Sequence, residues 1–238
     1  MRFDASASSP LDAFQRPGSQ GAQPAAGWVP PRPAAPPPWR VELLRASAES
    51  GANLAASGRG EAVLACGSCH GERGVSEPGG AYPRLAGLSA DYVAKQLDDY
   101  ASGARENEVM SSMAKALSVR ERAGLALHFA SLPAPEAPGR AGDGEAERRG
   151  RELHALGDQA LGTPACGNCH APRGSAGTDA IPGLYGQPAE YVAAQLRAWR
   201  EGTRRNDEAG VMAAIASRLR DEDLDALGAW YAAEQPKQ

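Results

Sequence analysis

The chain has 238 residues, of which 42% are hydrophobic, 23% charged and only 5% aromatic, and its formal net charge is −4. This length is typical of one or two domains, and the composition suits a packed core. The sequence shows neither the one-sided basic surface of a nucleic-acid-binding protein nor the run of about 18 apolar residues that spans a membrane. We therefore expect no nucleic-acid partner and no transmembrane segment.

The first 57 residues are expected to form a Pro-rich extension or linker that is partly disordered. Residues 27–40 (GWVPPRPAAPPPWR) predict polyproline II conformation, and a helix is expected from Val41. Trp28 and Trp39 are unusual in a spacer. The segment is therefore either a linker or an arm that docks on a partner or on the chain's own surface.

The rest of the chain is a tandem repeat. The segment YPRLAGLSADYVAKQLDDYASGARENE from Tyr82 matches IPGLYGQPAEYVAAQLRAWREGTRRND from Ile181, and the offset between the halves stays between 99 and 102 residues. A self-similar period of this kind indicates duplicated domains. We place them at residues 58–133 and 148–238, joined by a linker at residues 134–147 that is rich in Pro, Gly and Ala.

Each half shows helical periodicity and no alternating strand pattern, which predicts an all-α fold. One apolar helix face precedes the helix stop at Gly103. Its residues, and those of the equivalent face in the second half, are Tyr92, Val93, Gln96, Leu97 and Tyr100, and Tyr191, Val192, Gln195, Leu196 and Trp199. Ser118 followed by Glu121 predicts a capping box at the start of the next helix.

All four cysteines fall in two copies of C-x-x-C-H, within ACGSCHGERG from Ala65 and ACGNCHAPRG from Ala165. On a helical turn both thiols face one side, where they can add to the two vinyl groups of a haem while the histidine binds its iron. A structural zinc site would place its second C-x-x-C about 15–20 residues away, and a thioredoxin-like site needs a βαβ context. The pattern therefore favours covalent haem. The predicted attachment residues are Cys66, Cys69 and His70, and Cys166, Cys169 and His170.

A methionine is expected as the second axial ligand of each iron, because His/Met ligation is typical of electron-transfer cytochromes c. Met110 and Met212 occupy equivalent positions in the repeat, each seven residues before a leucine. Met113 has Ile215 as its counterpart, so we expect it to fill the core instead.

The two remaining histidines are expected to be structural. His128 aligns with Trp230 and is predicted to be a half-buried helix residue. His154 aligns with an apolar part of the first half and is likewise interpreted as a core residue rather than a ligand.

These features resemble a di-haem cytochrome c of the c4 type, in which two class I cytochrome c domains are fused in tandem. The resemblance covers about residues 58–235. It rests on both C-x-x-C-H motifs, on YPRLAG and IPGLYG, on the YVAxQL helices, on the GxRxN turns and on the late methionines. It implies that each domain wraps round one covalently bound haem c, so that the chain holds two. The Pro-rich extension lies outside the family pattern.

The resemblance also assigns roles to individual residues. The axial ligands that it implies are His70 with Met110, and His170 with Met212. It implies that the carbonyls of Pro83 and Pro182 accept a hydrogen bond from an N–H of the two histidine rings, which fixes each ring. It also implies that Arg105 and Arg204 lie near haem propionates, which suit a guanidinium; the alternative is two ordinary solvated arginines.

Two haems with both axial positions filled leave no open site for a substrate. We therefore expect an electron-transfer protein and no enzyme; a di-haem peroxidase would need an open haem. One interpretation is a carrier that takes electrons from a quinol-oxidising complex or a dehydrogenase to a terminal oxidase. The other is an obligate electron-transfer subunit of a periplasmic or membrane-bound dehydrogenase, which would associate this chain with the membrane through its partner.

A periplasmic location is expected, because bacteria attach haem to C-x-x-C-H on the outer side of the cytoplasmic membrane. The N-terminus shows no apolar segment of a signal peptide. We therefore expect that the export signal has been removed or replaced. The resemblance further implies that the two domains pack face to face, with the haems in electronic contact and at different potentials.

Overall fold

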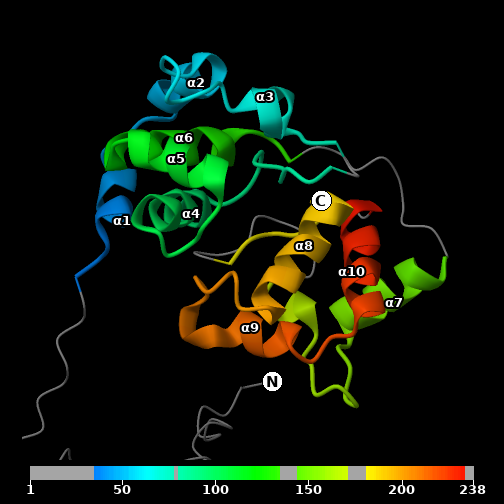
Figure 1. Ribbon diagram of the computed structural model, residues 1–238. Coiled ribbons are helices and arrows are strands. Elements are labelled where there is room, and N and C mark those ends of the chain that lie inside the picture. The colour runs from blue at the N-terminus through cyan, green and yellow to red at the C-terminus, as the bar shows by residue number, and fades with distance from the viewer. Residues whose placement is uncertain (1–34, 78–79, 135–143, 171–180, 234–238) are drawn as a thin grey trace, which may run out of the picture. The chain divides into compact units, whose positions relative to one another are not determined.

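The computed structural model describes residues 35–77, 80–134, 144–170 and 181–233, and those from Pro36 onward belong to one compact unit. All regular structure in these ranges is helical, as predicted (Figure 1). The helices of the first half are α1 (Pro38–Leu43), α2 (Ala48–Ser57), α3 (Gly67–His70), η2 (Glu72–Gly74), α4 (Ala90–Ser102), α5 (Glu108–Ala116) and α6 (Val119–Ser131). Those of the second half are α7 (Glu145–Ala155), η3 (Cys166–Asn168), α8 (Ala189–Arg200), η4 (Glu208–Gly210), α9 (Val211–Ala216) and α10 (Asp221–Ala233).

The N-terminal boundary of the first domain differs from the prediction. Pro38 opens α1, where its fixed φ suits the first helical turn, so residues 38–40 are helical and not polyproline II. Trp39 is only 7% exposed and packs in one core cluster with Leu88 and Tyr92. The packed part of the chain therefore begins near Pro36 and not at residue 58. Trp28 and the rest of residues 1–34 lie outside the described residues.

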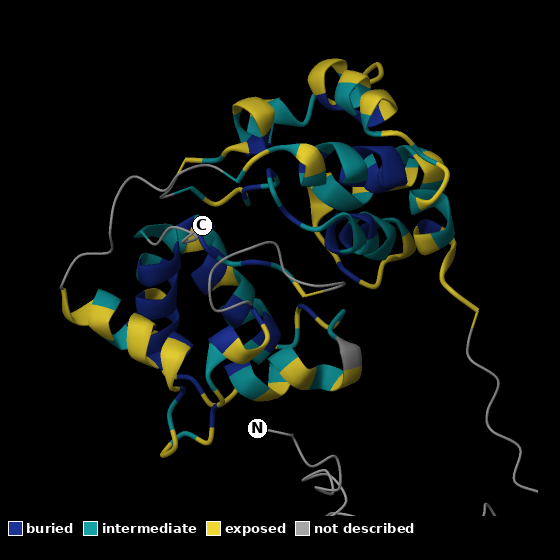
Figure 2. Cartoon of the chain, turned by 180° about the vertical axis from the view of Figure 1, so that it is seen from behind, coloured by how far each residue is buried: buried dark blue, intermediate teal, exposed yellow. Residues whose placement is uncertain are grey.

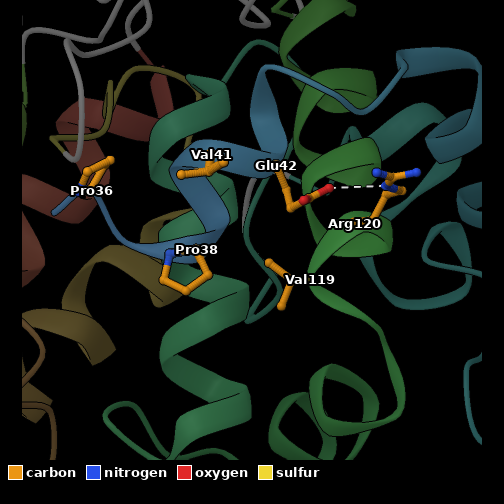
Figure 3. Close-up of a pocket in the computed structure, with 6 residues that line it drawn as sticks. All are labelled: Pro36, Pro38, Val41, Glu42, Val119 and Arg120. Carbon is orange, nitrogen blue, oxygen red and sulfur yellow. Dashed lines mark hydrogen bonds and ion pairs between the residues drawn. The ribbon is translucent and has the colours of Figure 1, made fainter.

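Helix α1 docks on the chain's own surface. Figure 3 shows Glu42 of α1 pointing toward Arg120 of α6, beside a shallow depression that Pro38 and Val119 help to line. Oε2 of Glu42 lies 3.0 Å from Nε of Arg120. Exposed ion pairs of this kind contribute about 1 kcal/mol or less. Burial of the Trp39 ring is therefore the main attachment of α1.

The two halves are built by the same helix packing. In the first half α6 contacts α1, α2 and α4, and in the second α10 contacts α7 and α8; the buried residues concentrate on these helices (Figure 2). A Cβ atom on Gly51 of α2 would lie 2.0 Å from the Gly124 carbonyl oxygen of α6. A Cβ atom on Gly150 of α7 would lie 2.3 Å from the Ala226 carbonyl oxygen of α10. The duplication therefore keeps the same close helix crossing in both halves.

Helix α4 follows the prediction from periodicity. It ends at Gly103, whose positive φ of 84° is a left-handed helix cap, and its Tyr92, Val93, Gln96 and Tyr100 are buried. The buried amide of Gln96 on this otherwise apolar face needs a hydrogen-bond partner. That partner comes from the other half of the chain, as described below.

The start of α6, the position of His128 and the start of α7 can each be compared with the prediction. The capping box of Ser118 and Glu121 is present, and His128 is half-buried in α6, as expected. Helix α7 begins at Glu145, before the domain start expected at residue 148, and most of the expected linker lies outside the described residues. Within the described ranges, no helix is long and apolar enough to cross a membrane.

Candidate functional site

Both C-x-x-C-H motifs form a single helical turn. The His70 amide donates a hydrogen bond to the Cys66 carbonyl at 3.0 Å, and the His170 amide makes the same bond to the Cys166 carbonyl at 3.0 Å. Neither pair of cysteines forms a disulfide. The described residues contain no group of three or more His, Cys, Asp or Glu side chains that could hold a metal ion. Each motif therefore presents two free thiols and a histidine from one turn.

The two motif histidines are held in the form that binds a metal. Nδ1 of His70 lies 2.9 Å from the Pro83 carbonyl oxygen, and Nδ1 of His170 lies 2.9 Å from the Pro182 carbonyl oxygen. A carbonyl can only accept, so Nδ1 donates and Nε2 keeps its lone pair. Burial lowers the pKa of both imidazoles, although each carbonyl acts to raise it. A neutral ring with a free Nε2 is the form that ligates iron.

The methionines are placed less symmetrically than the repeat suggests. In the second half, Cys166 and Met212 pack against the same core cluster. In the first half, Cys66 packs against its cluster together with Met113, while Met110 lies in the first turn of α5. The repeat thus favours Met110 as the ligand of the first iron, whereas packing places Met113 with the motif cysteine. Met110 and Met212 remain the proposed ligands, and a Met113→Ala variant would distinguish Met113 from Met110.

Arg105 joins the two halves of the chain. Its Nη1 donates to Oε1 of Gln96 in its own half at 2.7 Å. Its Nη2 donates to Oε1 of Gln195 in the other half at 2.7 Å and to the Tyr191 hydroxyl at 3.2 Å. Gln96 and Gln195 occupy equivalent positions in the repeat, so one guanidinium holds both members of a repeated pair.

Arg204 makes the equivalent contacts in reverse. It donates to Oε1 of Gln195 in its own half at 2.8 Å, to Oε1 of Gln96 across the contact at 3.2 Å and to the Tyr92 hydroxyl at 3.4 Å. Such reciprocal contacts are those of a two-fold interface, here between the duplicated halves of one chain. The residues that form this contact therefore occupy equivalent positions in both repeats.

The two arginines at this contact are buried without a carboxylate partner among the described residues. Arg105 is 6% exposed and Arg204 is 8% exposed, so the structure does not fit the alternative of two solvated arginines. Each instead lies over an aromatic ring, Arg105 at 4.7 Å from Tyr100 and Arg204 at 4.3 Å from Trp199. Two buried cations need anionic partners, and the carboxylates of haem propionates would supply them.

The positive charge at this contact affects the pKa of a neighbouring tyrosine, Tyr191. Burial acts to raise the pKa of Tyr191, but Arg105 and Arg204 hold that pKa below its ordinary value. The two guanidiniums thus outweigh desolvation at this position. An anionic group of a bound haem would be stabilised there in the same way.

A second pair of hydrogen bonds across the contact, here called the clamp, joins Arg84 to Gln187 and could not be predicted from the repeat. The backbone amide of Arg84 donates to Oε1 of Gln187 at 3.0 Å, and Nε2 of Gln187 donates back to the Arg84 carbonyl at 3.0 Å. Burial lowers the pKa of the Arg84 guanidinium to about 10. The residues at the equivalent positions are Gly183 and Leu88, so neither half predicts its partner.

Comparisons with known proteins identify the family. No family model matches the chain. A thiosulfate dehydrogenase electron acceptor from Thiomonas intermedia (strain K12) is 41% identical over 172 residues, which are 72% of this chain and 79% of that protein. A cytochrome c4 from Pseudomonas aeruginosa is 39% identical over 181 residues, which cover 74% of this chain and 86% of that protein. The chain belongs to the cytochrome c4 family. The crystal structure of reduced cytochrome c4 from Pseudomonas stutzeri has the same fold, with a TM-score of 0.69 and 33% identity over 79% of this chain and 98% of that one.

As a cytochrome c4, the chain is an electron-transfer protein with two covalently bound haem c groups, and not an enzyme. The geometry fits this cofactor on three counts. Each motif turn offers two thiols, each motif histidine has a free Nε2, and the contact between the halves holds two buried cations that need carboxylates. The predictions of fold class and cofactor are therefore confirmed.

Proposed function

We propose that this cytochrome c4 accepts electrons from a thiosulfate-oxidising dehydrogenase in the periplasm and passes them on to a terminal oxidase. One observation carries the proposal: both haem motifs lie in one compact unit, and the halves that bear them share a buried, reciprocal hydrogen-bonded contact. Such a contact would let one half face the donor while the other faces the acceptor. The choice of donor is supported by the 41% identity to a thiosulfate dehydrogenase electron acceptor.

The roles of the chain's residues follow from their chemistry. When bound, each haem iron takes up and releases one electron. His70 and His170 would ligate the irons through Nε2, and the Pro83 and Pro182 carbonyls would hold the rings in place. Met110 and Met212 would complete the ligation and favour the reduced iron.

The buried guanidiniums would act on the cofactor's charge. Arg105 and Arg204 would neutralise propionates at the contact between the halves, where an unpaired carboxylate would be costly. Fixed positive charge at this contact would also favour uptake of an electron by a haem bound beside it. The contact would therefore keep the haems near one another and the potentials high enough to accept electrons from a dehydrogenase.

The proposal predicts which donor reduces the protein. Oxidised holoprotein is mixed with thiosulfate and a catalytic amount of the thiosulfate dehydrogenase of Thiomonas intermedia, and the absorbance of ferrous haem is followed. We expect rapid reduction of both haems at a rate that saturates with the concentration of this protein. Without thiosulfate, or without the dehydrogenase, the haems should stay oxidised.

The competing function is a carrier from a quinol-oxidising complex to the oxidase. A parallel reaction with quinol and such a complex decides between the two. Fast, saturable reduction in that reaction, with none above background from the dehydrogenase, would refute thiosulfate oxidation as the electron source while leaving the two-haem carrier intact. Co-purification with the dehydrogenase would identify the chain as its subunit rather than a free carrier.

A further inference from the structure

A hydrogen-bonded cluster of His154, Tyr185 and Tyr231 lies beside the second haem motif. Nδ1 of His154 is 2.9 Å from the Tyr231 hydroxyl, and Nε2 is 3.0 Å from the Tyr185 hydroxyl. All three side chains are buried. The Trp230 ring covers the imidazole, with 4.4 Å between ring centroids. His154 is thus the core residue expected from the sequence, but it is bonded at both ring nitrogens.

This cluster touches the turn that carries the haem cysteines. A Cβ atom on Gly167, inside the second C-x-x-C, would lie 2.8 Å from Nε2 of His154, so the absence of a side chain lets the imidazole approach the motif. Cys166 packs against the core cluster that contains Tyr231. Burial raises the pKa of the Cys166 thiol to about 11, and a hydrogen bond from the Tyr231 hydroxyl acts in the opposite direction.

Haem attachment sets the direction of these hydrogen bonds. When the Cys166 thiol adds to a vinyl group, a sulfur–carbon bond forms and the thiol proton moves to the other vinyl carbon. The resulting thioether sulfur has no proton and can only accept. The Tyr231 hydroxyl, which already acts as a hydrogen-bond donor on the pKa of the Cys166 thiol, would then donate to this sulfur. With Tyr231 as that donor, Nδ1–H of His154 would donate to Tyr231, and Tyr185 would donate to Nε2. A neutral imidazole can make both of its hydrogen bonds in this series, because it donates at Nδ1 and accepts at Nε2.

At the equivalent positions of the first half, all of which the structure describes, these hydrogen bonds have no counterpart. The repeat aligns His154 with Ala55, Tyr185 with Ala86 and Tyr231 with Phe129. Ala55 and Phe129 belong to the apolar cluster against which Cys66 packs. Two haem sites with the same motif therefore differ in the polarity around their attachment cysteines.

We propose that Tyr231, oriented by His154 and Tyr185, raises the reduction potential of the second haem relative to the first by donating a hydrogen bond to its attachment sulfur. The positive end of the hydroxyl dipole points at a haem substituent from a buried site. In a low-dielectric interior this dipole stabilises the additional electron of the reduced haem. Hydrogen bonding around the cofactor is one of the means by which a protein sets its potential.

The test is Tyr231→Phe in the holoprotein, with both potentials measured by spectroelectrochemical titration. Paramagnetically shifted haem methyl signals in NMR spectra distinguish the two haems. The equilibrium constant for moving an electron from the first haem to the second should fall about three- to tenfold, the range that one net hydrogen bond contributes. The potential of the first haem should not change. As a matched control, Tyr82→Phe removes the hydroxyl of an exposed tyrosine and keeps the ring that lies edge-on to His70 of the first motif, so it should leave the constant unaltered.

Further variants separate this role from a purely structural one. Tyr185→Phe removes the hydroxyl that lies farthest from the sulfur in this series of hydrogen bonds. It should lower the same equilibrium constant by a smaller factor than Tyr231→Phe does. This variant therefore decides the matter if Tyr231→Phe loses its haem. His154→Leu should lower the constant, and His154→Gln, which can both donate and accept, should restore it. An unchanged constant in the Tyr231 and Tyr185 variants, or an equal shift of both potentials, would overturn the proposal.

Discussion

Replacing Met110 or Met212 by alanine is expected to remove about half of the far-red absorption band that methionine-bound ferric haems show, because each methionine would serve one of two irons. The potential of the affected haem should fall as well, since a thioether ligand favours the reduced iron. Axial ligands set haem potentials over a range of about 0.8 V, so we expect this to be the largest electronic effect of any single substitution. A ferric spectrum and a redox titration measure both changes.

Met113→Ala is the decisive control for the first half. Met113 packs against the same cluster as Cys66, so its truncation should lower the free energy of unfolding by about 2–5 kcal/mol. It should leave the far-red band in place. If Met113→Ala removes half of the band and Met110→Ala does not, then packing rather than repeat position identifies the ligand of the first iron.

The second large effect is expected at the contact between the halves. Arg105→Ala and Arg204→Ala should each lower the free energy of unfolding by about 3–5 kcal/mol, because each would leave a buried carboxylate of the haem without its cationic partner. Both arginines donate to Gln96 and Gln195. Their effects should therefore not add in the double variant. Denaturant unfolding of the holoproteins measures these differences.

The matched control is Arg200→Ala, which removes an exposed ion pair with Asp221 near the end of α8. It should cost about 1 kcal/mol or less. NMR relaxation provides an independent readout: in the double arginine variant the halves should tumble more independently than in the native protein. If Arg105→Ala and Arg204→Ala lower the free energy of unfolding no more than Arg200→Ala does, and the tumbling is unchanged, then the two buried arginines neither hold a propionate nor join the halves.

The features that the sequence predicts are those with local or repeated signals. The C-x-x-C-H turns, the face of α4 and the capping box at Ser118 each depend on residues three or four apart, and the duplication repeats the first two of these patterns in the second half. Gln96 and Gln195 also carried a signal, because each places an amide on an apolar helix face in the same register. An amide repeated at the same register of an apolar helix face in both halves indicates a contact between them.

Other features depend on contacts that no local pattern reports. The Pro-rich composition around Trp39 predicts polyproline II, yet the ring is buried on α4 and α6 and the chain folds into α1. The clamp of Arg84 and Gln187 has no counterpart in the repeat. His154 was expected in the core, but its bonds to two tyrosines from distant segments could come only from tertiary structure.

The central claim, that this chain is a two-haem electron carrier, is tested most directly by the intact mass of the purified holoprotein. The account predicts a mass that exceeds that of the polypeptide by two haem groups, neither of which is extracted by acidified acetone. In the double variant Cys166→Ser and Cys169→Ser, the excess should fall to one haem. An excess of a single haem in the native protein, or haem that acidified acetone extracts, would contradict the account.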